Sequence, residues 1–429
     1  MHTIHALIID LTLITIYAGI TTLICKKLKQ PIVLGYVLAG IFAGPYFDLL
    51  PTVSDRENLS LWADIGVIFL LFGLGLEFSF KKMLNVGKSA MITANANILF
   101  MLFLGYYTGL LLGWSTTDSF FLGSMISMSS TTIIIKAFDD LNIKKQKFTD
   151  LVFGVLVIED LVGILLLVLL PMVALGQSIN GGELALSTFK LLSFLILCFV
   201  IGIYIVPTVL KKLTSFLNDE MLLLITVGMC FGMVWLATAS GFSSALGAFL
   251  MGSVLSETGL IVRIENVVRP LKDFFGAVFF VSVGMMVDPA MFVTYAGPIA
   301  VVTLIVVVGK VVFSCFGFVI SGQSLRTSTE CAFSLAQVGE FAFIIAALGM
   351  SLGVLDGQVY PVIVAVSVIT TFLTPVMIRS AGPVYRLIER KLPASWSRYI
   401  NNDQVPLVEG PWYVCELQPK VHHCMGGLV

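Results

Sequence analysis

Two neighbouring carboxylates stand in an otherwise apolar run, VLVIEDLVGILL at residues 155–166. If a membrane span begins near residue 149, Asp160 lies roughly 17 Å along it, close to the middle of a hydrocarbon core about 30 Å thick. A charged group at that depth costs at least a few kcal/mol. Glu159 and Asp160 are therefore candidates for a site that binds a cation and a proton in turn. The alternative is a protonated acid that ties helices together.

A lysine also lies inside an apolar run, in the stretch VVVGKVVFS at 306–314. A buried lysine loses its proton readily, so Lys310 needs a partner that stabilises its charge. We expect that partner to be Glu159 or Asp160. A purely structural ion pair is the alternative, and it is compatible with a cation that displaces Lys310 during transport.

Two polar stretches interrupt apolar runs 207 residues apart, SMSSTT at 127–132 and SLAQVGEF at 334–341. Their hydroxyl groups compete for backbone hydrogen bonds, and irregular backbone at membrane depth is tolerated where it lines a cavity. We therefore expect two broken helices, whose ends carry partial charges that can surround an ion. The side chains expected to support the ion site are those of Ser129, Ser130, Thr131, Gln337 and Glu340. For Ser129 and Thr131, hydrogen bonding between helices is the alternative.

The composition explains why such groups are exceptional in this chain. Of the 429 residues 58% are hydrophobic and only 12% are charged, whereas a soluble domain has about 25% charged residues. The apolar runs are too long for barrel strands, so an all-α polytopic membrane protein is predicted. No basic stripe predicts a nucleic-acid partner, and no pattern predicts an enzyme, a bound cofactor or a structural metal. The stretch GLGLE at 73–77 lacks the third glycine of a nucleotide loop, so close helix packing is the better interpretation.

About thirteen segments are long and apolar enough to span a membrane. They lie at roughly 4–25, 31–48, 61–80, 89–113, 117–138, 149–175, 186–210, 220–239, 242–256, 271–288, 293–320, 327–352 and 357–379. If the N-terminus is outside, 22 of the 25 Lys and Arg residues fall in cytoplasmic connections or the C-terminal tail. Because cytoplasmic loops are enriched in these residues, this asymmetry supports the count and predicts a cytoplasmic C-terminus.

Two motifs recur in the same order in the second half of the chain. LGYVLAG at 34–40 matches LGAFLMG at 246–252, which is 212 residues further on, and GVIF at 66–69 matches GAVF at 276–279. An odd number of spans separates the two copies, which predicts inverted repeats at about 31–210 and 220–379. Chance similarity between helices rich in Gly and Leu is the alternative. The predicted organisation is a transmembrane domain at 1–380 and a short cytoplasmic tail at 381–429.

The sequence resembles the monovalent cation:proton antiporter-2 family, especially its Kef-type potassium/proton branch. Besides Lys310, the stretches that carry the resemblance are QPIVLGYVLAGIFAGP (30–45), GVIFLLFGLGLEFS (66–79), MSSTT (128–132), VIEDLVG (157–163), SALGAFLMGSVLSE (244–257), FFVSVGMMVD (279–288) and AQVGEFAF (336–343). The resemblance implies a homodimer of thirteen-helix chains with crossed, broken helices at 117–138 and 327–352. It also implies that Asp160 is the essential ion- and proton-binding aspartate and that Lys310 is the core lysine.

Two features depart from the Kef-type pattern. Members of that branch generally have Gln before the aspartate, where this chain has Glu159. This difference leaves open the choice of ion and the number of protons per cycle. Members also carry a C-terminal nucleotide-binding domain, whereas no G-x-G-x-x-G follows residue 380 in this sequence, so gating by a nucleotide in cis is not expected.

The expected function is exchange of Na⁺ or K⁺ for protons across the cell (inner) membrane, in the service of pH homeostasis. Asp160 would hold the cation or a proton but never both, and Glu159 would add a carboxylate oxygen or a second titrating site. A ligand-gated K⁺ efflux channel and an ion-sensing protein without transport activity are the alternatives.

Overall fold

A computed structural model describes residues 2–28, 30–46, 51–53, 56–77, 87–141, 143, 146–174, 218–240 and 242–391, with scattered positions between 193 and 212. The described residues form helices joined by short connections. The predicted span at 186–210 lies largely outside the described residues, and so do the predicted tail beyond residue 391 and the 81–86 connection.

The helices follow the predicted segments closely. In the first half they are α1 (His2–Lys27), α2 (Ile32–Ala43), α3 (Arg56–Glu77), α5 (Lys88–Leu111), α6 (Thr116–Ser127), α7 (Thr131–Asp140) and α8 (Lys147–Ala174). In the second half they are α10 (Asp219–Ala239), α11 (Ser244–Ser256), α12 (Ile261–Met285), α13 (Pro289–Thr294), α14 (Ala296–Ile320), α15 (Leu325–Ser334), α16 (Phe341–Ser351) and α17 (Val359–Lys391). Two predicted spans are each divided into two helices, as the polar stretches within them indicated.

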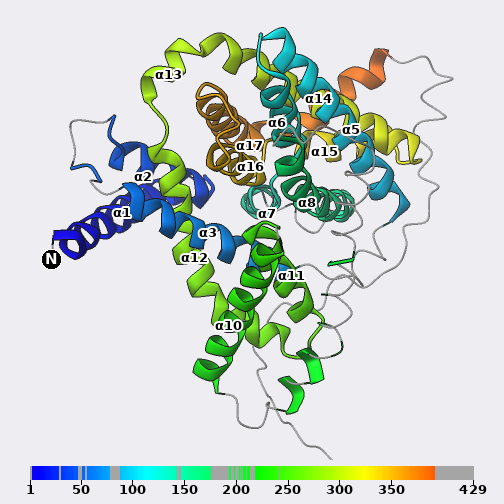
Figure 1. Cartoon of the computed structure of the whole chain (residues 1–429). Helices are drawn as coiled ribbons and strands as arrows, with labels where there is room; N and C mark the ends of the chain where they lie inside the picture. Colours follow the sequence, from blue (N-terminus) through cyan, green and yellow to red (C-terminus); the bar gives the residue numbers. More distant parts are fainter. Residues whose placement is uncertain are drawn as a thin grey trace, which may run out of the picture.

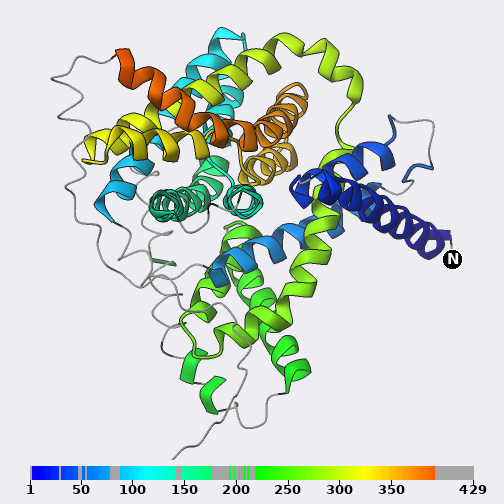
Figure 2. The same cartoon turned by 180° about the vertical axis from the view of Figure 1, so that it is seen from behind.

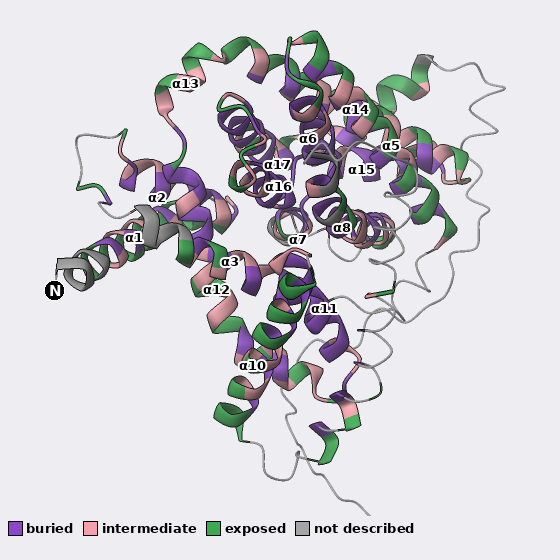
Figure 3. Ribbon diagram, viewed as in Figure 1, coloured by how far each residue is buried: buried purple, intermediate pink, exposed green. Residues whose placement is uncertain are grey.

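The described helices suit a membrane in length and surface. Seven stretches are long and apolar enough to cross it, one of which runs through α6 and α7 together (Thr116–Phe138), and α2, α11 and α16 are shorter apolar helices. Large apolar side chains on the outer helices are exposed, such as Leu224 and Trp235 on α10 and Leu304 on α14. Figure 3 shows exposed residues along α10 and α5, whereas α16 and the first part of α17 are mostly buried. The apolar outer surface is what contact with lipid tails requires.

The helices are arranged in two groups (Figures 1 and 2). In one group α1, α2, α3, α10, α11 and α12 pack on one another, and in the other α5 to α8 pack with α14 to α17. The short α13 links α12 of the first group to α14 of the second. The carboxylates Glu159 and Asp160 and the two broken helices all belong to the second group.

Reciprocal glycine contacts join the two repeats. A Cβ on Gly40 of α2 would lie 2.0 Å from the Val281 carbonyl oxygen of α12, and a Cβ on Gly284 of α12 would lie 2.1 Å from the Val37 carbonyl oxygen of α2. Gly75 and Gly252 make the same exchange between α3 and α11. The glycines that the sequence motifs align therefore occupy equivalent places in the two halves, as the inverted-repeat prediction requires.

The two broken helices begin alike. Ser115 precedes α6 and its hydroxyl accepts a hydrogen bond from the Asp118 backbone N–H at 3.0 Å. Ser324, 209 residues later, precedes α15 and accepts from the Thr327 N–H at 3.3 Å. Serine is a favoured residue at this position because its oxygen satisfies an N–H that has no partner within the helix. The starting points of both broken helices are thus set by the same local signal.

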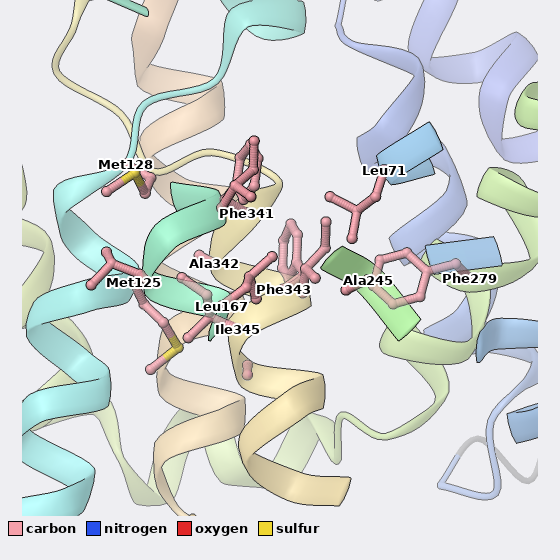
Figure 4. Close-up of a cluster of buried hydrophobic side chains, with 14 of the residues drawn as sticks. Leu71, Met125, Met128, Leu167, Ala245, Phe279, Phe341, Ala342, Phe343 and Ile345 are labelled. Carbon is pink, nitrogen blue, oxygen red and sulfur yellow. The ribbon is translucent and has the colours of Figure 1, made fainter. Parts of the chain in front are cut away.

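Buried side chains connect the breaks to the first group of helices. Figure 4 shows Met128 and Phe341, which adjoin the two breaks, in one cluster with Leu71 of α3 and Phe279 of α12. All four are almost completely removed from solvent. Because interiors are close-packed, this cluster holds the broken helices against the other group.

The glycine contacts give the first testable prediction. Substitution Gly40→Ala should destabilise the protein by about 1–3 kcal/mol, because its Cβ would displace the backbone of α12. Gly228→Ala in α10 is the control, since nothing lies within 4 Å of its Cβ position. Thermal unfolding of detergent-purified protein measures both changes, and equal transition temperatures for the two variants would refute the close contact.

Candidate functional site

The two helix breaks meet in direct backbone contact. The Gly339 N–H donates to the Met128 carbonyl at 3.0 Å, and the Ser129 hydroxyl donates to the Leu335 carbonyl at 3.2 Å. The Gln337 amide donates to the Ser130 carbonyl at 3.3 Å. A Cβ on Gly339 would lie 2.6 Å from the Ser129 carbonyl oxygen, so only glycine permits this approach. The crossing of the broken helices is thereby established, and it satisfies backbone groups that the helices leave free.

Asp160 lies on α8 beside the first turn of α7. Its carboxylate is half-buried and accepts a hydrogen bond from the Thr131 hydroxyl at 3.1 Å. Glu340 is close enough to Asp160 for their charges to interact. The carboxylate of Glu340 accepts a short hydrogen bond from the Ser130 hydroxyl and another from Thr132 at 2.8 Å. Two carboxylates and three hydroxyl groups thus surround the N-terminal end of a half-helix.

Glu159 faces a different environment from its neighbour, as consecutive helix residues should. It is completely buried. One carboxylate oxygen accepts from the Asn97 side-chain amide at 2.7 Å, and the other accepts from the Ser129 backbone N–H at 2.8 Å. Glu159 therefore binds the break between α6 and α7 directly, whereas Asp160 retains contact with solvent.

Lys310 lies on α14 and is also completely buried. Its ammonium donates to the Ser129 hydroxyl at 2.7 Å and lies 3.4 Å from the Ser127 carbonyl at the C-terminal end of α6. The direct ion pair expected with Glu159 or Asp160 is not among the contacts of the described residues. Glu159 instead interacts with Lys310 through space, and Ser129 contacts both. Glu159 is thus the acid that interacts with Lys310, but Ser129 contacts both groups in place of a direct ion pair.

Cavities lead toward the site from one end of the bundle. A cavity of about 260 Å³ lies between the start of α2, α7 and α17, and Lys136 and Arg379 are among its lining residues. A smaller cavity shares Ile133 and Thr371 with it and is also lined by Glu340. The positive-charge distribution predicts that Lys136 and Arg379 lie near the cytoplasmic surface. The two cavities therefore lie between the predicted cytoplasmic side and Glu340.

The predicted site residues come together around one crossing. The side chains concerned are those of Ser129, Ser130, Thr131, Glu159, Asp160, Lys310, Gln337 and Glu340. The sequence analysis missed Asn97, which is fully buried and bonds to Glu159. The available signal was an amide within the apolar run ITANANILF, which is unusual inside a span.

The Thr131 contact supports a second prediction. Thr131→Val removes the hydroxyl that donates to Asp160 but keeps the shape of the side chain. We expect the cation concentration for half-maximal transport to change by roughly 3–10-fold, which corresponds to the net contribution of a typical hydrogen bond, about 0.5–1.5 kcal/mol. Thr208→Val is the control, because Thr208 is exposed and its hydroxyl donates to the Tyr204 carbonyl within its own helix turn. An unchanged cation dependence in Thr131→Val would exclude this hydroxyl from the site.

Comparison with solved structures defines the class of fold. The sodium proton antiporter MjNhaP1 of Methanocaldococcus jannaschii matches with a TM-score of 0.65 at 17% identity, over 89% of this chain and 100% of that one. The chain therefore has the sodium/proton antiporter fold, with broken helices that cross.

Sequence comparison identifies the family. Residues 12–381 match the family described as "Sodium/hydrogen exchanger, transmembrane", and the chain belongs to it. The Escherichia coli (strain K12) protein YbaL is 33% identical over 373 residues, which are 84% of this chain and 66% of that protein. K(+) efflux antiporter 5 of Arabidopsis thaliana is 29% identical, over 87% of this chain and 66% of that protein. The K(+)/H(+) antiporter subunit KhtU of Bacillus subtilis (strain 168) is 28% identical, over 87% of this chain and 93% of that protein.

These relatives confirm the resemblance to the Kef-type branch. The chain spans just under two thirds of the length of YbaL and of the Arabidopsis protein.

Proposed function

We propose that the chain exchanges a monovalent cation, Na⁺ or K⁺, for protons across the membrane by alternating access. Family membership and the names of the relatives support cation:proton exchange. The observation that carries the proposal is the half-buried carboxylate of Asp160 at the crossing of two broken helices. Oxygen ligands from such a site suit hard cations, and a carboxylate can take a proton in their place.

Asp160 is the shared site in this proposal. When it binds a cation, the hydroxyl groups of Ser130 and Thr131 and the carboxylate of Glu340 lie within the same region and complete an oxygen shell. When it binds a proton, the charge is removed without a cation. An empty, charged carboxylate is costly to move through a low-dielectric barrier, so movement follows neutralisation by one ion or the other.

The moving element in this proposal is the group that contains α5 to α8 and α14 to α17. Its breaks face the other group across the buried cluster that contains Met128, Phe341, Leu71 and Phe279. The cavities that lead to Glu340 support a conformation open toward the predicted cytoplasmic side. Sliding of the two groups would close this route and open the opposite one.

We also propose the membrane, the orientation, the oligomeric state and the physiological role of the protein. We place the protein in the cell (inner) membrane with its N-terminus outside, as the Lys and Arg distribution predicts. A homodimer, contacts with membrane lipids, and a role in pH homeostasis extend the same proposal. The organisation into a transmembrane domain at 1–380 and a cytoplasmic tail at 381–429 stays a prediction.

A proton-flux assay in liposomes tests the function. Purified protein is reconstituted with a pH-sensitive dye inside, and Na⁺, K⁺ and Li⁺ gradients are applied over a series of pH values. An exchanger moves protons against the direction of the cation at zero membrane potential. A cation flux that does not depend on the proton gradient and carries current under an applied voltage would indicate a channel. Cation binding without flux would indicate a sensor.

A further inference from the structure

Glu159, the residue before Asp160, has surroundings that do not suit a residue that binds the transported ion. Glu159 has no exposed surface, and each of its carboxylate oxygens already accepts an N–H, from Asn97 and from Ser129. A cation ligand must be reachable from the aqueous cavity and must release its other partners. Asp160 is half-buried, so part of its surface stays accessible, whereas Glu159 has no exposed surface.

The second repeat shows what the position of Glu159 does. Thr370 follows Glu159 by 211 residues and lies on α17, and its hydroxyl accepts from the Val338 backbone N–H at 3.3 Å. Val338 follows Ser129 by 209 residues and lies in the other helix break. In each repeat a side chain on the helix that follows the broken helix therefore accepts a backbone N–H of the break. Because Thr370 carries no charge, the function that Glu159 and Thr370 share is to hold the backbone of the break.

The additional charge of Glu159 has a partner in the same network. Lys310 is buried and donates to the hydroxyl of Ser129, whose backbone N–H bonds to Glu159. Lys310 of α14 and the neighbouring Asp160 are charged groups close enough to interact with Glu159. Removing the negative charge would leave the ammonium of Lys310 buried without compensation, which is strongly unfavourable.

Asn97 fixes the carboxylate in this arrangement. It is fully buried on α5, and its amide donates to Glu159 at 2.7 Å. Its own side-chain oxygen has no hydrogen-bond partner among the described residues. The amide is therefore held by its contact with Glu159, and it orients the carboxylate toward the Ser129 N–H.

We propose that Glu159 is a structural carboxylate that holds the α6–α7 break and balances Lys310, and that Asn97 is its positioning residue. Glu159 then neither binds the transported cation nor carries a proton during the cycle. This inference rests on the proposed exchange function and narrows it, because it leaves Asp160 as the acid that exchanges its occupant. It replaces the sequence-based expectation that Glu159 supplies a second ligand or titrating site.

A charge swap tests the inference. In the double variant Asn97→Asp with Glu159→Gln, the amide introduced at position 159 can donate to the carboxylate introduced at position 97 and accept from Ser129, so both hydrogen bonds and the negative charge are retained. Each single variant should slow exchange at least about tenfold, because one leaves two carboxylates in contact and the other leaves Lys310 uncompensated. The double variant should recover to within about threefold of wild type, with the same proton-to-cation ratio and half-maximal cation concentration.

The assay compares wild type, both single variants and the double variant in liposomes, and checks folding by thermal unfolding. The inference would be overturned if the double variant folded well but exchanged no faster than the slower single variant. It would also be overturned if the double variant had a different proton-to-cation ratio or a tenfold higher half-maximal cation concentration. If the double variant does not fold, Glu159→Gln decides the matter: an unchanged ratio supports the inference, whereas loss of one proton per cation or complete loss of exchange in folded protein overturns it. Absence of exchange in wild type would instead reject the proposed function.

Discussion

Substitution Asp160→Asn is expected to reduce cation-driven proton movement by at least about two orders of magnitude, as for loss of a proton-transfer group. Asparagine keeps the size of the side chain and can still accept from the Thr131 hydroxyl. It cannot take up a proton in exchange for a cation at any physiological pH. The structure around the crossing should therefore survive while the exchange is lost, which initial rates of dye response in liposomes will measure.

The control for this variant lies on the same helix. Asp150→Asn alters an exposed acid in the first turn of α8, about ten residues before the site. We expect Asp150→Asn to retain exchange within about twofold, because an exposed charge at a helix end contributes little. If Asp160→Asn transported as fast as Asp150→Asn, Asp160 would not be the shared site.

Substitution Lys310→Met has the second largest expected effect, on stability. Methionine fills much of the same space, but the substitution leaves the carboxylate of Glu159 buried without a compensating charge. Removing one partner of a buried pair typically costs about 3–5 kcal/mol. The variant should show a clearly lower transition temperature in thermal unfolding of the detergent-purified protein.

Two comparisons isolate the electrostatic cause. Combining Lys310→Met with Glu159→Gln should recover part of the lost stability, since the double variant has neither buried charge. Lys272→Met removes the ammonium that lies 3.0 Å from the partly exposed Glu77, and a pair of that kind contributes about 0–1 kcal/mol. Equal losses in Lys310→Met and Lys272→Met would contradict a buried compensating role for Lys310.

The two repeats differ in the charged residues that they contribute to the site. The helix that follows the break carries Glu159 and Asp160 in the first repeat and Thr370 and Thr371 in the second. In each repeat one of these side chains accepts a backbone N–H of the break, but the second repeat supplies its acid, Glu340, from the break itself. The two repeats therefore contribute unequal numbers of carboxylates to the site.

Much of the fold could be predicted from the sequence because the physical signals are local. The polar stretches at 127–132 and 334–341 indicated both helix breaks, and the structure confirms them at residues 128–130 and 335–340. The glycine motifs indicated the repeat, and Gly40 and Gly284 are in fact the sites of closest helix contact. Long apolar helices and small interface residues are constraints that membranes impose strongly.

The hydrogen-bond partners within the site could be predicted only in part, because they depend on distances between helices. The sequence placed Lys310 and Glu159 at similar depth, but it could not show that Ser129 stands between them. It gave no reason to connect Asn97 with Glu159, which are 62 residues apart and on different helices. Which carboxylate faces the cavity was equally out of reach, since adjacent residues of a helix diverge by about 100°.

The most direct test of a shared site is the cation dependence of exchange at a series of pH values. If Asp160 holds either a cation or a proton, the two ions compete. The cation concentration for half-maximal exchange should then rise about tenfold for each unit of pH below the range in which the site is deprotonated, while the maximal rate is retained. A half-maximal cation concentration that stays constant from acid to alkaline pH would contradict the account, because the cation and the proton would then occupy separate sites.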